Sequence, residues 1–96
     1  PGGSLVALIK PQFEAGKDLV GKNGVVRDAK VHSLVIQKVL AFCREKGWTV
    51  SGLAFSPIKG PKGNVEFLLY LSDRPGDVDV FSVVDAAHQN LDGDER

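Results

Sequence analysis

Two short apolar segments, residues 5–9 and 65–71, constrain the fold of this 96-residue chain more than any other feature. Both are too short for a typical helix and are almost continuously aliphatic or aromatic, which is typical of strands. Segment 5–9 reads as a strand buried on both faces. It ends at Lys10-Pro11, where the proline disfavours helical geometry for the residue before it. We therefore expect two apolar strands in one sheet.

Two helices and a third strand are predicted between and after these segments. Asp28 is placed to cap a helix that has an apolar stripe from Val31 to Cys43 and ends at Gly47. Asp77 is placed to cap a second helix, with its apolar stripe at positions 80, 84, 87 and 91. Residues 48–58 are rich enough in β-branched and aromatic residues for a strand, in which Gly52 indicates a bulge or a close backbone approach.

The order of these elements predicts an α/β fold in a single domain of residues 1–96, with a frayed tail at 92–96. The first strand, the loop 11–28, the first helix and strand 48–58 form a βαβ unit, whose two strands run parallel. Turn residues at 59–64 then predict that the last strand runs antiparallel. If this strand inserts between the other two, Glu66 lies beside Lys10.

Composition excludes several classes of protein. Twelve basic and twelve acidic residues give no net charge, although residues 1–62 hold ten basic and four acidic side chains and residues 63–96 hold two and eight. No apolar run is long enough to span a membrane. The single Cys43 reads as a small buried residue, and its distance in sequence from His32 and His88 predicts no metal site. We expect a cytoplasmic protein that contacts neither a membrane nor a metal.

Lys10 and Glu66 are the charged residues that end or interrupt the two most apolar segments. An unpaired buried charge is strongly unfavourable, so each side chain needs the other or another polar partner. One interpretation is a structural ion pair across neighbouring strands. The other is a functional site, because ligands of open α/β sheets bind at the carboxyl ends of parallel strands.

Several longer motifs resemble one family. They are the turn Pro1–Gly3, the run Lys10-Pro11-Gln12-Phe13-Glu14, the glycine-containing stretches 20–28 and 56–64, and the strand Val65-Glu66-Phe67-Leu68. Together they resemble the hemolysin A-type (TlyA) ribosomal RNA methyltransferases, which belong to the FtsJ-like ribose 2'-O-methyltransferases. The resemblance covers residues 1 to about 72.

This resemblance implies the C-terminal half of a Rossmann-like methyltransferase domain that acts on ribosomal RNA. It assigns Lys10 and Glu66 to the second lysine and the glutamate of a catalytic Lys-Asp-Lys-Glu tetrad. The other two members, and the glycine-rich loop that binds S-adenosylmethionine, are expected upstream of Pro1. The segment by itself is therefore expected to be an inactive part of an S-adenosylmethionine-dependent enzyme.

The loop 11–28 carries Lys17, Lys22 and Arg27 near the aromatic Phe13. Such residues can hold RNA phosphates and stack a base, although the loop could equally be a solvated connection with Phe13 packed in the core. The alternative for the whole chain is a non-catalytic RNA-binding or interaction module with a methyltransferase-like fold. In either case a half-sheet leaves an open edge through which the isolated segment can dimerise.

Overall fold

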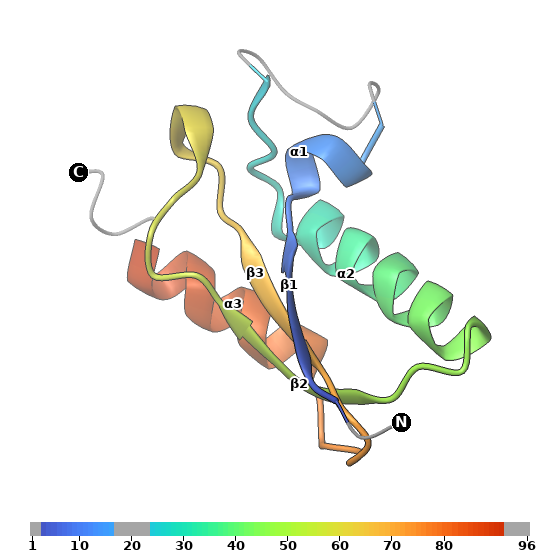
Figure 1. Ribbon diagram of the computed structural model, residues 1–96. Helices are drawn as coiled ribbons and strands as arrows, with labels where there is room; N and C mark the ends of the chain where they lie inside the picture. The colour runs from blue at the N-terminus through green and yellow to red at the C-terminus, as the bar shows by residue number, and fades with distance from the viewer. Residues whose placement is uncertain (1–2, 17–23, 92–96) are drawn as a thin grey trace.

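The computed structural model describes residues 3–16 and 24–91, so Lys17, Lys22 and the tail 92–96 lie outside the described residues. The elements are β1 (Leu5–Ile9), α1 (Pro11–Glu14), α2 (Ala29–Glu45), β2 (Val50–Phe55), the short 3-10 helix η3 (Pro61–Gly63), β3 (Phe67–Leu71) and α3 (Val80–Leu91). The predicted α/β class is confirmed, and Figure 1 shows the three strands side by side with α2 and α3 packed against them.

The third strand lies in the middle of the sheet, as predicted. The strand order is β1-β3-β2, and both outer strands pair antiparallel with β3, so β1 and β2 run in the same direction. The register between β2 and β3 shifts between Val50 and Gly52. This shift confirms the predicted bulge rather than the alternative of a close backbone approach, because the atoms nearest to a Cβ added at Gly52 belong to the Tyr70 side chain, with Cδ2 at 3.3 Å.

Local signals at the ends of α2 are confirmed. Asp28 accepts a hydrogen bond from the backbone N–H of Lys30 at 2.8 Å, and Gly47 takes the left-handed conformation (φ +78°) that favours glycine after a helix. The predicted cap of α3 is wrong. Asp79, not Asp77, accepts from the backbone N–H of Ser82 at 3.1 Å, because α3 begins at Val80. Hydrogen bonds from the backbone and side chain of Ser82 lower the pKa of the Asp79 carboxyl.

A third helix was not expected from the sequence. The predicted loop 11–28 begins with the single turn α1, where Pro11 occupies the first helical position. Proline has no N–H to satisfy there and its fixed φ suits the first turn. Pro11, which follows the end of β1 by two residues, therefore starts α1. The backbone N–H groups of Phe13 and Glu14 both donate to the carbonyl of Lys10.

The core lies between the sheet and the two long helices. It contains β-strand residues such as Phe67 and Leu69 together with Ile36 of α2 and Ala87 of α3. Cys43 belongs to the same cluster, as predicted, and its burial raises the pKa of the thiol.

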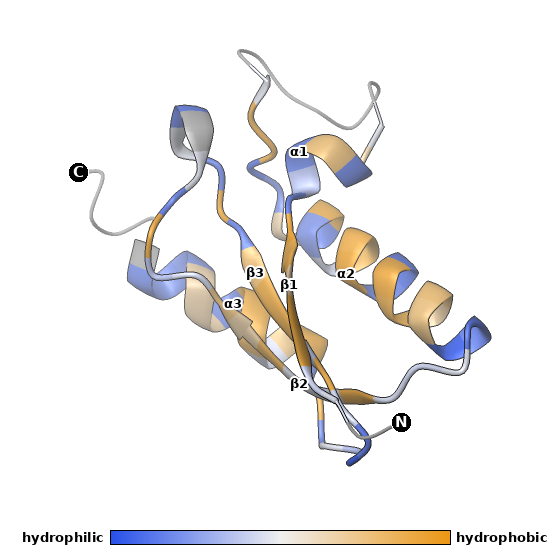
Figure 2. Ribbon diagram, viewed as in Figure 1, coloured by the Kyte–Doolittle hydropathy of each residue, from blue (hydrophilic) through white to orange (hydrophobic). Residues whose placement is uncertain are grey.

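The expectation that strand 5–9 is buried on both faces is wrong. Ile9 is 2% exposed, but Leu5, Val6 and Leu8 are 58%, 55% and 47% exposed. The reason is that β1 is an edge strand, of which Ile9 belongs to the core cluster and Ala7 packs against it, while the alternate residues Val6 and Leu8 point to the other face. An apolar groove of about 480 Å³ runs between β1 and α2 and includes Phe42 and the half-exposed Trp48, and Figure 2 shows the apolar residues of both elements.

An exposed apolar edge strand predicts self-association of the isolated chain. We expect the weight-average mass in sedimentation velocity to rise with protein concentration, and Leu8→Lys to reduce that rise by placing a charge on the strand. Leu34→Lys is the matched control, because Leu34 is exposed to a similar degree on α2 (48%). A monomer at every concentration, or an equal effect of the two variants, would contradict the expectation.

Candidate active site

The pairing of β1 with β3 brings Lys10 and Glu66 together along the backbone. The last paired residues are Ile9 and Phe67, so one further step along both chains places Lys10 opposite Glu66. Side chains of directly opposite residues emerge on the same face of a sheet. The strand register therefore confirms the prediction that Glu66 lies next to Lys10.

The two charged groups have separate partners. Glu66 is buried at 6% exposure, and its Oε2 accepts a hydrogen bond of 3.0 Å from Gln12 Nε2. The Lys10 ammonium lies 5.7 Å from the centre of the Phe13 ring, in cation–π range. Within residues 3–16 and 24–91 no Lys10–Glu66 ion pair forms, so the interpretation of these residues as a structural ion pair is wrong for this structure.

Gln12 is a site residue that the sequence did not single out. Its carbonyl oxygen Oε1 is buried and, in the part of the chain that the structure describes, has no hydrogen-bond partner. Its amide nitrogen is committed to Glu66. The α1 turn that places Gln12 depends on Pro11, whose side chain is fully buried beneath it. Gln12 thus holds the Glu66 carboxylate through its amide nitrogen, while its carbonyl oxygen is a buried acceptor without a partner among the described residues.

Gly60 makes room for the buried carboxylate. A Cβ added at this position would overlap Glu66 Oε2. The Gly60 N–H donates to the carbonyl of Asn64 at 2.7 Å, which folds the β2–β3 connection over Glu66. Any larger residue at this position would require the Glu66 carboxylate or the loop to shift, so the glycine in the turn at 59–64 also shapes the site.

A second network holds the segment that precedes α2. Asn64 is buried, accepts from the Val26 N–H at 2.9 Å and donates to the Gly24 carbonyl at 3.0 Å. His32 Nε2 lies 2.8 Å from the Val26 carbonyl, and His32 Nδ1 lies 2.8 Å from His88 Nε2. Because a carbonyl can only accept, Nε2 of His32 carries a proton. The sequence did not predict this histidine pair, because the two residues are 56 positions apart and meet only where α2 packs on α3.

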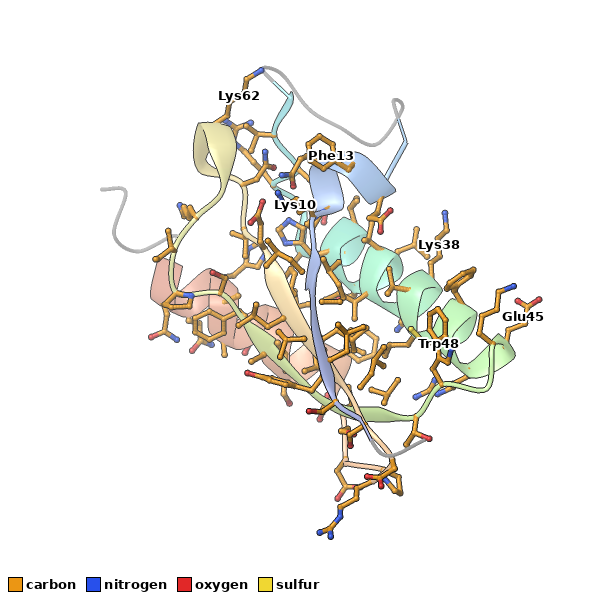
Figure 3. The ribbon with its side chains drawn as sticks, in the orientation of Figure 1. Lys10, Phe13, Lys38, Glu45, Trp48 and Lys62 are labelled. Atoms are coloured by element: carbon orange, nitrogen blue, oxygen red, sulfur yellow. The ribbon has the colours of Figure 1, made fainter. Side chains whose placement is uncertain are left out.

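Of the three predicted RNA-binding residues, only Arg27 lies within the described residues, and its side chain is exposed. Arg27, Lys59 and Lys62 line one cavity of about 170 Å³ beside the histidine pair. Phe13 is 74% exposed, so the alternative that it packs in the core is wrong. Lys10 and Phe13 lie close together near the top of the view in Figure 3, at the end of β1.

Comparison with known proteins gives consistent matches. Residues 3–73 match the FtsJ-like methyltransferase family. A presumed rRNA methyltransferase of Bacillus subtilis, YqxC, is 45% identical over 95% of this chain and 35% of its own length. The Mycobacterium tuberculosis 16S/23S rRNA (cytidine-2'-O)-methyltransferase TlyA is 45% identical over 70% of this chain and 25% of its own length.

A solved structure agrees with these matches. A presumed hemolysin from Streptococcus thermophilus superposes with a TM-score of 0.87 at 42% identity, over 98% of this chain and 36% of that one. The chain thus spans about a third or less of the length of these relatives. None of the helices in the described ranges has the length and hydropathy needed to cross a membrane, and the same ranges contain no group of three or more potential metal ligands from His, Cys, Asp and Glu.

The contact between Gly60 and Glu66 generates a stability prediction. Gly60→Ala forces either the carboxylate or the loop to move, so we expect the free energy of unfolding to fall by about 1–3 kcal/mol, as for other overpacked sites. Urea denaturation measures this change. Gly3→Ala is the control, because nothing lies within 4 Å of a Cβ added there. Equal stability of the two variants would show that Glu66 is not held against Gly60.

Proposed function

Because this chain belongs to the FtsJ-like methyltransferase family, we propose that it is the part of an rRNA ribose 2'-O-methyltransferase that contributes Lys10 and Glu66 to catalysis. The observation that carries the proposal is the β1–β3 register, which places a lysine at the end of one strand beside a buried carboxylate on the next. The name of the M. tuberculosis relative, an rRNA (cytidine-2'-O)-methyltransferase, supports the substrate class. The proposal assigns the rest of a Rossmann-like domain to sequence outside this chain, and the chain's coverage of 36% of the S. thermophilus protein is compatible with that assignment.

The proposed chemistry needs a group that handles a proton. A ribose hydroxyl is a poor nucleophile and loses its proton as its oxygen attacks carbon. Lys10 either accepts that proton or stabilises the negative charge that develops on the oxygen. Gln12 holds the Glu66 carboxylate on the neighbouring strand, and in this proposal Glu66 orients the lysine once the ammonium turns from Phe13 toward the substrate. Its carboxylate is not consumed by an ion pair with Lys10 within the described residues, which leaves the ammonium able to turn toward a substrate.

The methyl donor proposed for this reaction is S-adenosylmethionine, whose sulfonium supplies an electrophilic methyl group. The described residues do not fit that cofactor. The cavity close to Glu66 is lined by Arg27, Lys59 and Lys62, which suit an anion rather than a sulfonium cation. We therefore assign cofactor binding to the part of the fold outside this chain and expect the chain alone to be inactive.

Binding of RNA in this proposal uses the surface around α1. Phe13 offers an exposed aromatic face on which an unpaired base can stack, with the Lys10 ammonium beside it. Lys17, Lys22 and Arg27 belong to the same stretch of sequence and are proposed to contact phosphates. A ribosomal RNA substrate also favours the expected cytoplasmic location.

A second candidate function is a non-catalytic RNA-binding module. The exposed Phe13 and the cation-lined cavity favour this alternative, because neither requires Lys10 to act as a catalyst. The two candidates differ in what removal of the Lys10 ammonium does to methyl transfer and to RNA binding.

The decisive variant is Lys10→Ala in a full-length protein that contains this sequence. We expect methyl transfer from radiolabelled S-adenosylmethionine to ribosomal RNA to fall by about 10²–10⁴-fold, the usual contribution of a general acid or base. Lys38→Ala is the control, because Lys38 is an exposed lysine on α2. Turnover that survives Lys10→Ala, with RNA binding intact, would reject the catalytic assignment and favour the binding module.

A further inference from the structure

We propose that the cavity lined by Arg27, Lys59 and Lys62 binds a backbone phosphate of the RNA substrate. This inference rests on the proposed function for its choice of RNA. The cavity lies between the segment that precedes α2 and the β2–β3 connection, with the histidine pair at its side.

The described lining of the cavity is cationic. It brings together three cationic side chains from two parts of the chain that are about thirty residues apart, and among residues 3–16 and 24–91 no Asp or Glu lines it. Arginine and lysine side chains that converge on one point form strong charge-assisted hydrogen bonds with phosphate oxygens. The lining therefore favours an anion.

Lys62 has an unusual backbone conformation. It is the one non-glycine residue with positive φ in the described part of the chain (φ 61°). That backbone carries the side chain over Gly24, where a Cβ would lie 3.5 Å from the Lys62 ammonium. The ammonium is thus directed at the segment that forms the opposite wall, and Figure 3 shows Lys62 reaching from η3 toward it.

The cavity is preorganised and small. Asn64 and His32 fix the peptide groups of Val26 from two directions, so the wall that carries Arg27 is held before any ligand arrives. A volume of about 170 Å³ is below the roughly 300–1,000 Å³ of typical small-molecule pockets. The space therefore suits a single phosphate group of a larger molecule better than a complete nucleotide or cofactor.

The cavity is also well placed for this role. Val65 lines it, and the next residue is the buried Glu66. An RNA strand anchored here would pass close to the end of β1, where Lys10 and Phe13 lie. The cavity would thus fix the register of the strand while the aromatic residue and the candidate catalytic pair receive a nucleotide.

The test measures binding of the 96-residue chain to a fluorescein-labelled oligouridine by fluorescence anisotropy over a range of salt concentrations. Arg27→Gln and Lys62→Gln each remove one phosphate contact, so each should weaken binding about fivefold at about 0.1 M salt and lower the slope of log affinity against log salt by about 0.7. Lys38→Gln makes the same charge change away from the cavity and should leave both values unchanged. In the unmodified chain, the amide resonances of Val26 and Gly63 should shift when the oligouridine is added.

Several outcomes would overturn the inference. Equal weakening by Lys38→Gln would show non-specific attraction, and unshifted Val26 and Gly63 resonances would place the RNA elsewhere. Inorganic phosphate that binds as tightly as the oligouridine would indicate a site for a small free anion. None of these outcomes bears on Lys10, because the assay contains no methyl donor, so failure here is distinguishable from failure of the proposed catalytic function.

Discussion

The antiparallel pairing of β3 with β1 is the constraint on which the rest of the structure depends. It fixes Phe67 opposite Ile9 and, one residue on, Glu66 beside Lys10. A slip of one residue in this register would send Phe67 out of the core and turn Glu66 into it. Burial of Phe67, which is fully inaccessible, therefore fixes the position of the neighbouring carboxylate as well.

Local contacts then fix the position of the Glu66 carboxylate within this strand register. Gly60 leaves the space that the Glu66 carboxylate fills, and Gln12 donates the hydrogen bond that the buried charge requires. Asn64 ties the β2–β3 connection to the segment ahead of α2. The same connection therefore shapes two neighbouring places: a buried carboxylate beside a lysine, and a cavity lined by cations. An enzyme that acts on nucleic acid needs both a reactive group and a means of holding phosphates.

Much of the fold could be predicted because its signals are local or follow from topology. The Asp28 cap, the Gly47 terminus and the bulge at Gly52 each depend on a few adjacent residues. The position of β3 followed from connection rules that allow few arrangements of three strands. The α1 turn was missed because the glycines that follow it in the sequence suggested an irregular loop.

The parts of the site that the sequence did not reveal depend on contacts between distant residues. The His32–His88 hydrogen bond joins residues 56 positions apart, and the contact of Gln12 with Glu66 spans 54. No spacing rule relates such positions. The exposure of Leu8 could not be read from its apolar run either, because a strand's burial depends on what covers it rather than on its own residues.

We propose that Lys10 and Glu66 act as one unit in methyl transfer. A double-mutant cycle in a full-length protein that contains this sequence tests it most directly, through the rates of Lys10→Ala, Glu66→Gln and the double variant. If the two side chains act together, the double variant should be about as slow as Lys10→Ala alone. Multiplicative losses, in which each substitution reduces the rate by the same factor in both backgrounds, would contradict the account.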